Sequence, residues 1–335
     1  MKLKLMGIIV CIMLVTTLFA VAQPSQLRQK QTKEPVPVPT TSAVEVPVWE
    51  VGNQWTYKVD NLTINYNEPE RVVNLYLSMA ELPLTVAAVD DTTYTVDFGT
   101  SMTGQSSVDV NLGDGPINGT ITLPNMKIEG SIIFEKSTLG IKALSATLNG
   151  RFWVDIKQQP YLPFSVPVLP VKMKVDLLTD FSNNVTLVSF PLNTSMMWNS
   201  TATNLTLNGE IRSPWLYVML LINQIAALAQ YELLPPEIAA LLPVVNIKDA
   251  FDTLGTGNTF AIPSIPAAFM SMNNTESVTV PGGTFDAYNI TIITGMARCY
   301  YAPAAKNIIK IAGNIQDIIP FVTNIKMELK STNVS

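Results

Sequence analysis

The sequence predicts a mainly β protein, a β-rich α+β chain whose antiparallel sheet is accompanied by one apolar helical insert at about residues 214–254. Apolar and polar residues alternate in segment after segment, which is typical of strands with one buried face. Turn signals such as Asn149-Gly150, Asn208-Gly209 and Gly282-Gly283 separate these segments. Together these features predict about ten to twelve strands.

The N-terminus predicts export. Lys2 and Lys4 precede an apolar run that ends in Ala20-Val21-Ala22, so residues 1–22 are expected to form a signal peptide cleaved before Gln23. An uncleaved signal anchor is the alternative, because the apolar run reaches the lower end of the membrane-spanning range. Either form places the rest of the chain outside the cytoplasm, secreted or at the cell surface.

A proline-rich linker is expected between this signal and the folded part. Residues 23–46 contain Pro35, Pro37 and Pro39 among polar residues, a composition that favours an extended spacer over a packed core. The sequence therefore predicts a single β-rich domain over residues 47–335, with the helical insert inside it.

Composition narrows the possible functions. With 47% hydrophobic and 14% charged residues among 335, the chain has enough apolar surface to build a core. Its net charge of −5 argues against nucleic acid as a partner. There is no histidine, so catalytic triads that need one are missing, and zinc or copper is not expected.

Few other groups could carry chemistry, and the sequence predicts a non-catalytic protein without cofactor or metal. Removal of the signal leaves one cysteine, Cys299, which is expected to be a small buried residue. The run from Asp109 to Gly115 departs from a calcium loop, since Gly113 and Thr120 stand where oxygen ligands are needed, so we interpret it as a hairpin turn. Carboxylate pairs for glycoside hydrolysis stay open, because the fold sets their geometry.

The first strand is predicted by VWEVGNQWTYKVD, residues 47–59. Its apolar residues occupy odd positions, and a turn or bulge is expected at Gly52-Asn53. After Asp60-Asn61 the apolar set moves to even positions, which predicts a second bulge. The odd set is Trp49, Val51, Trp55, Tyr57 and Val59, and the even set is Leu62, Ile64 and Tyr66. We expect the aromatic residues to be buried, and an exposed platform that stacks on carbohydrate is the alternative.

The helical insert is predicted from Ser213-Pro214, a cap followed by proline, to Pro235-Pro236, which stops the first helix. Shorter helices are expected at 237–242 and 248–254, the last capped by Asn246. The long helix is apolar on nearly every side, so it is expected to be buried against the sheet, with Leu221 inside. A membrane span is the alternative.

Several short motifs carry a resemblance to a known group of proteins. The run W-x-x-G-x-x-W-x-Y, formed by Trp49, Gly52, Trp55 and Tyr57, resembles the first strand of exported prokaryotic proteins, many of them archaeal, that are related to the half-barrel lipoprotein-carrier (LolA-like) and lipid-binding superfamily. Further similar stretches are Phe190-Pro191-Leu192 followed by Trp198, the run from Val280 to Tyr288, and Tyr300-Tyr301-Ala302-Pro303.

The resemblance implies a curled antiparallel sheet or half-barrel around one or more helices, and relatives with an open groove carry acyl chains. The chain departs from the pattern at Asn193-Thr194-Ser195, where a glycine is expected, and at residues 304–307, which replace a Gly-rich turn.

Glycosylation is the strongest chemical signal. Sequons occur at Asn61, Asn118, Asn184, Asn193, Asn199, Asn204, Asn273, Asn289 and Asn333. A strand with a polar face also places Asn and Thr two residues apart, so sheet patterning is an alternative origin for these motifs. In an exported chain, solvent-facing sequons are nevertheless expected to carry glycans.

Two classes of function follow. The first is a structural or interaction protein of the cell surface or extracellular space, with cell-envelope components as partners. The alternative is a carrier or binding module for a lipid or other apolar ligand held between sheet and helices, which needs an apolar cavity on the order of several hundred Å³. The candidate apolar lining is Trp49, Trp55, Tyr57, Trp215, Met219, Leu221 and Ile222.

Overall fold

The fold is known from a computed structural model of the chain. It describes residues 43–68, 71–111, 116–158, 166–185, 188–193, 195–199, 201–214, 221, 224, 244–253, 258–262, 270–292, 296–314 and 322–334. The expected signal peptide, most of the linker and the helix at 237–242 lie outside these residues, as do Trp215, Met219 and Ile222.

The described residues form one antiparallel sheet, which confirms the predicted mainly β class. Its fourteen strands run in the order β10-β11-β12-β13-β14-β1-β2-β3-β4-β5-β6-β7-β8, and β9 pairs separately with β7. The strands in the first half of the chain are β1 (Gln54–Glu68), β2 (Arg71–Val89), β3 (Thr93–Asn111), β4 (Pro116–Glu135), β5 (Ile141–Gln158), β6 (Val166–Val185) and β7 (Thr203–Arg212). The others are β8 (Val244–Asn246), β9 (Thr259–Ile262), β10 (Met270–Val280), β11 (Gly283–Ile292), β12 (Ala297–Ala302), β13 (Asn307–Gly313) and β14 (Val322–Thr332).

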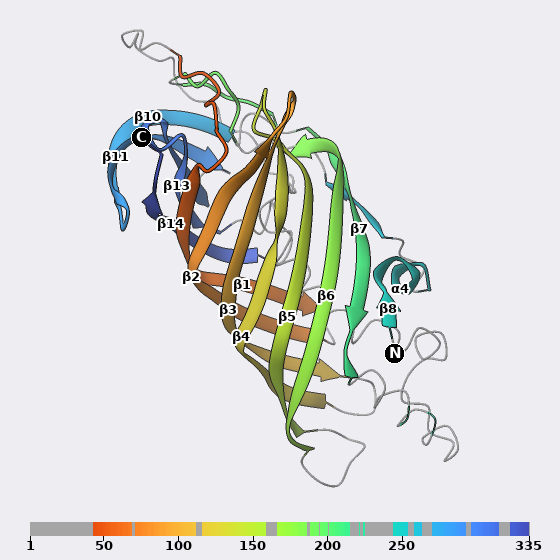
Figure 1. Ribbon diagram of the computed structural model, residues 1–335. Helices are drawn as coiled ribbons and strands as arrows, with labels where there is room; N and C mark the ends of the chain where they lie inside the picture. The colour runs from red at the N-terminus through yellow and green to blue at the C-terminus, as the bar shows by residue number, and fades with distance from the viewer. Residues whose placement is uncertain are drawn as a thin grey trace.

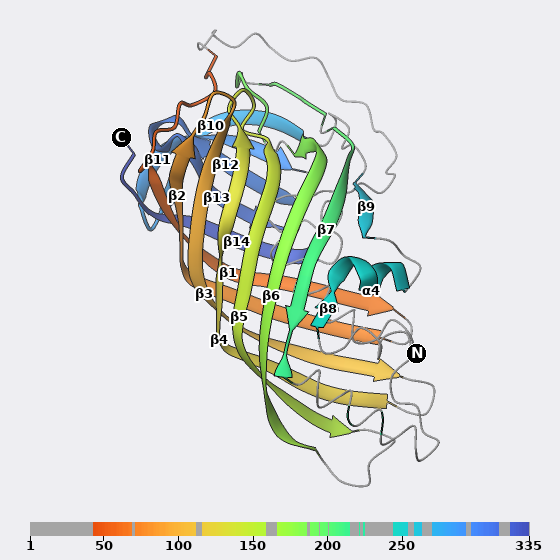
Figure 2. The same ribbon diagram turned by 45° about the vertical axis from the view of Figure 1, so that its right-hand side comes forward.

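The sheet is long-stranded and strongly bent. Figure 1 shows β2 to β7 side by side as a broad surface, with β10 to β14 continuing the sheet beyond β1. In Figure 2 the long strands β1 to β6 turn at the lower left, so that the two halves of the sheet face each other. This shape gives the sheet an inner and an outer face.

Bulges in neighbouring strands explain the bend. The register shifts between Val59 and Leu62 in the β1–β2 pair, and between Met102 and Gly104 in the β3–β4 pair. The β2–β3 and β4–β5 pairs are interrupted in the same way near the middle of their strands. Because a bulge bends its strand and increases the local twist, a series of bulges across adjacent strands folds the sheet along a line.

The predicted change of parity in the first strand is confirmed. Asn61 has a φ of 51°, and the buried residues change from odd to even positions on either side of it. Trp55 and Tyr57 are buried on one face of β1, and Trp49 is buried just before the strand, so the alternative of an exposed aromatic platform at these residues is wrong. Val51, expected to be buried with them, is exposed because it lies in the turn with Gly52, whose φ is 90°.

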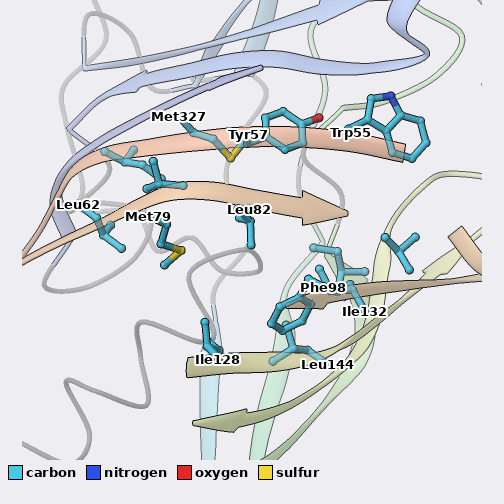
Figure 3. Close-up of a cluster of buried hydrophobic side chains, with 14 of the residues drawn as sticks. Trp55, Tyr57, Leu62, Met79, Leu82, Phe98, Ile128, Ile132, Leu144 and Met327 are labelled. Atoms are coloured by element: carbon cyan, nitrogen blue, oxygen red, sulfur yellow. The ribbon is translucent and has the colours of Figure 1, made fainter. Parts of the chain in front are cut away.

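The inner face carries one continuous hydrophobic core. Side chains from β1 to β5 and β14 gather there, including Trp55, Leu82, Phe98, Leu144 and Met327 (Figure 3). The predicted hairpin that follows Asp109 is confirmed, since Asn111 pairs with Pro116, and so is the turn at Gly282, where Val280 pairs with Gly283.

Two of the predicted turn signals are not turns. Asn149-Gly150 lies within β5 and Asn208-Gly209 within β7. A Cβ at Gly150 would lie 2.6 Å from the Met126 sulfur, and one at Gly209 would lie 1.9 Å from the Asp176 carbonyl oxygen. Glycine in these strands permits close approach of the neighbouring strand, so β5 and β7 continue through the predicted turns. The described residues nevertheless form fourteen strands, more than the ten to twelve that the sequence predicts.

The apolar helical insert at about 214–254 is not shown, although its last helix is described. The predicted last helix is confirmed as α4 (Ile247–Thr253), and the Asn246 side chain accepts a hydrogen bond from the Asp249 amide, as an N-cap does. Residues 244–246, however, form β8 and pair with β7. Leu221 is helical but 57% exposed, so the expectation that it is buried is wrong. Within the described residues, no helix is both long and apolar enough to cross a bilayer.

Both edges of the sheet are partly covered. The segment 195–198 follows β6 in sequence, yet it hydrogen-bonds to β10 at the far end of the strand order, through Met270 and Met272. The same loop pairs with the chain before β1, since Leu192 and Val44 exchange two backbone hydrogen bonds. At the other edge, β7 pairs with two short strands, β8 and β9.

Two consecutive leucines of β6 test the assignment of the faces. Leu177 points into the core and is 4% exposed, whereas Leu178 points outward and is 54% exposed. We expect Leu177→Ala to lower the free energy of unfolding by about 2–5 kcal/mol, because it leaves a cavity in the core. Leu178→Ala should change it by no more than about 0.5 kcal/mol. Urea denaturation measures both, and equal effects of the two substitutions would contradict the inner and outer faces.

Candidate functional site

Three aromatic side chains at the start of the fold are fixed by hydrogen bonds to one distant segment, residues 305–308. This segment begins at the end of the 3-10 helix η2 (Pro303–Ala305), which follows β12, and ends in the first residues of β13. The Trp55 indole N–H donates to the carbonyl of Ala305 at 2.7 Å, and the Tyr57 hydroxyl donates to that of Ile308 at 2.7 Å. The Trp49 indole N–H donates to the carbonyl of Lys306 at 2.9 Å.

These contacts decide the role of the predicted lining residues. Trp55 and Tyr57 are fully buried and use their polar atoms within the protein, so they belong to the core rather than to the surface of a cavity. Trp49 packs on three rings, those of Trp55, Tyr94 and Phe134, with centroids between 5.0 and 5.3 Å away. Among the described candidates, Trp49 alone lines an apolar cleft.

The cleft opens where the ends of β4, β5 and β6 approach the turn after β12. The Phe190 ring meets Tyr301 edge to face at 5.3 Å across part of it. Its lining residues are Trp49, Phe134, Leu139, Ile141, Val185, Val188, Phe190, Tyr301, Asn307 and Ile308. The cavity volume is about 60 Å³, whereas ligand pockets are typically about 300–1,000 Å³. This cleft has room for a small apolar group and not for an acyl chain.

A second hollow lies on the outer face, over β4 to β7. It has a volume of about 340 Å³ and a polar rim that includes Glu129, Thr147 and Asp176. The Asp176 carboxylate accepts a hydrogen bond from the Thr147 hydroxyl at 2.7 Å and pairs with Lys174 at 2.8 Å. Ala146, Leu177 and Leu178 line the hollow together with these polar groups, and it is open to solvent rather than enclosed. It is therefore not the enclosed apolar cavity that a carrier needs.

Shifted titration among the described residues has structural causes. Burial raises the pKa of the Cys299 thiol and of the Tyr57 and Tyr301 hydroxyls well above their usual ranges. Cys299 is buried, as the sequence predicts, and a thiol that stays protonated is a poor nucleophile. Hydrogen bonds from Thr93 and Thr92 lower the pKa of Asp90 to about 2, which stabilises the turn between β2 and β3.

Metal-binding groups are also missing from the described residues. No cluster of three or more carboxylate or cysteine side chains there could hold a metal ion. The calcium alternative depended on residues 109–115, of which 112–115 lie outside the described part of the chain.

The structure separates the sequon asparagines by exposure. Asn61, Asn193, Asn199, Asn204, Asn273 and Asn333 are exposed, Asn118 and Asn184 are partly buried, and Asn289 is buried. The Asn289 side-chain amide donates to the Glu276 carboxylate at 3.0 Å, and that of Asn184 donates to Glu135 at 2.8 Å. A glycan attached to either nitrogen would have to displace these bonds.

The outer face holds exposed aromatic residues that sequence reasoning missed. Tyr76 is 54% exposed and Trp153 is 40% exposed, both on outward positions of their strands. The signal was present, because Trp153 lies between the apolar residues Phe152 and Val154, and alternation along a strand places it on the face opposite to theirs.

Comparison of the chain with family models, curated proteins and solved structures finds no match.

The hydrogen bond from Tyr57 to Ile308 can be tested by removing the hydroxyl group of the tyrosine. We expect Tyr57→Phe to lower the free energy of unfolding by about 1–3 kcal/mol, because it leaves the buried carbonyl of Ile308 without its donor. Tyr76→Phe removes the same hydroxyl from an exposed ring and should cost no more than about 0.5 kcal/mol. Thermal or urea unfolding distinguishes them, and a Tyr57→Phe protein as stable as Tyr76→Phe would show that the bond is unimportant.

Proposed function

We propose that this protein is an exported, non-catalytic protein of the cell surface or extracellular space, with a structural or interaction role. One observation carries the proposal: the inner face of the folded sheet is filled by its own side chains in one continuous core. A sheet whose concave side is already packed needs no ligand for stability, and it leaves the outer face for contacts with partners.

The alternative, a carrier for a lipid or another apolar ligand, has less support. The apolar cleft at Trp49 has a volume of about 60 Å³, far below what an acyl chain requires. A half-barrel packed around a helical insert also stays a proposal, because most of residues 215–243 lie outside the described part of the chain. The exposure of Leu221 argues against an insert that is buried on all sides.

Export is supported by the sequence at the N-terminus and by the sequons. Six of the nine acceptor asparagines have exposed side chains, as expected of a glycoprotein surface. Asn61, Asn193 and Asn204 combine exposure with side-chain amide nitrogens that donate no hydrogen bond within the described residues. We propose these three as the preferred acceptors.

Native mass spectrometry of the exported protein, with lipid extraction, tests the choice between a surface protein and a carrier. We expect the mass of the polypeptide plus glycans, and no lipid in the organic phase, because the cleft cannot hold an acyl chain. A lipid recovered at one molecule per chain would overturn the proposal in favour of the carrier.

Glycopeptide mapping tests the choice of acceptors. In a host that has the transferase, we expect occupied sites at Asn61, Asn193 and Asn204, and each Asn→Gln substitution should remove one glycan mass. Asn289 serves as the internal control, since its buried amide should leave that sequon empty. Occupancy of Asn289 with the three exposed sites empty would refute the surface assignment.

A further inference from the structure

A row of outward side chains crosses four strands of the outer face and ends in an aromatic ring on each side. The register pairs Tyr76 with Gln105, Gln105 with Thr122, and Thr122 with Trp153. All four side chains are exposed. Three strand spacings separate the two aromatic residues, about 14 Å along the row. The exposed rings of Trp153 and Tyr76 can stack on the apolar faces of sugars, and the residues between them offer an amide and a hydroxyl.

A cationic row lies directly beside this aromatic row. Arg151 is two residues before Trp153 on β5, so both point outward, and it pairs in register with Lys172 on β6. Lys127 is on the next row, opposite Asn149. Arg151, Lys172 and Lys127 are exposed and form no ion pair within the described part of the chain.

The pairing of Arg151 with Lys172 differs from the charge pattern at the other end of the sheet. Lys174 and Arg212 also lie opposite each other, but each of them is paired with a carboxylate. At the β1, β13 and β14 end, residues of opposite charge face each other, namely Lys58 with Glu328, Asp60 with Lys326, and Lys310 with Glu328. Like charges directly opposite in a sheet are destabilising. The cationic pair thus carries an unbalanced charge that an anionic partner would neutralise.

The charge around the cations limits the kind of anion. On one side, Lys174 and Arg212 are already paired with the carboxylates of Asp176 and Glu210. On the other side, Asp155 follows Trp153 at the next outward position. A narrow cationic strip bordered by carboxylates suits a ligand chain whose negative charges are separated by uncharged units. It suits a polyphosphate poorly, because the flanking carboxylates would repel its closely spaced charges.

We propose that the outer face of β2 to β6 around Trp153 binds an acidic oligosaccharide. Trp153 and Tyr76 stack on sugar rings, Arg151 and Lys172 pair with carboxylates of the sugars, and Gln105 and Thr122 hydrogen-bond to hydroxyl groups. A guanidinium group suits this task because it can bind a carboxylate through two parallel hydrogen bonds. This inference rests on the proposed role as an interaction protein and names the class of its partner.

The test is binding of the full exported protein to a panel of immobilised oligosaccharides that bear uronate, sialate or no acidic group. We expect binding to acidic members and little to neutral ones, with an affinity that falls as salt rises because part of it is electrostatic. Trp153→Ala should weaken binding at least about tenfold and keep the salt dependence. The double variant Arg151→Gln/Lys172→Gln should weaken it by a similar factor and reduce the salt dependence.

Matched controls separate the site from net charge and stability. Lys58→Gln/Lys326→Gln changes the charge of the chain by the same amount at the other end of the outer face, and it should leave binding unchanged. All variants should keep the melting temperature within a few degrees of the parent, about what small surface effects allow.

Each other outcome has a definite meaning. Absence of binding to every acidic sugar, equal binding to neutral sugars, or an equal loss in the control variant overturns this inference. Stronger binding to single-stranded DNA or to vesicles of anionic phospholipid, abolished by the same variants, replaces the sugar with another anion and also overturns it. None of these results affects the proposed role as a surface protein, which lipid extraction and glycopeptide mapping test separately.

Discussion

The fold depends on the hydrogen bonds that connect the first strand to a turn about 250 residues later in the chain. β1 lies between β14 and β2, so it joins the two parts of the sheet. Trp55 and Tyr57 project from it with their apolar bodies in the core, and their polar tips donate hydrogen bonds to the carbonyls of Ala305, at the end of η2, and of Ile308, in β13. Since an unpaired buried carbonyl costs more than a hydrogen bond contributes, neither partner is readily replaced alone. These aromatic residues at the start of the fold thus hold two distant segments of the chain together. We call Trp55, Tyr57 and their two hydrogen bonds the clasp.

The clasp and the line of bulges act together on the shape of the sheet. Bulges bend the long strands until the two halves face each other, and the clasp holds the β12–β13 turn against the start of β1. Among the described residues, the side chains of one continuous core fill the space between the two halves. The inner face supplies stability and the outer face is free to vary in chemistry, which explains why exposed rings and unpaired cations occur on the outer side of β2 to β6.

The sequence allowed prediction of features that depend on local order. The change of parity at Asn61, the burial of Cys299 and the cap of α4 at Asn246 each follow from a few neighbouring residues. Features that depend on the adjacent strand could not be predicted. Gly150 and Gly209 predict turns from their local sequence, since the atoms that exclude a side chain there belong to another strand. The row that contains Trp153 could not be predicted for the same reason, because register between strands leaves no mark in a single sequence. Leu221, an apolar residue expected to be buried, is exposed.

The partial coverage of the sheet edges limits edge-to-edge pairing between copies of the chain. An uncovered edge strand is a template for another molecule, and long flat edges lead to fibres. At one edge, β8 is only three residues long, and both β8 and β9 pair with β7. At the other edge, residues 195–198 form hydrogen bonds with the backbone of Met270 and Met272 on β10. Such edges hinder neighbouring copies from joining their sheets into a continuous fibril, even where many copies lie close together.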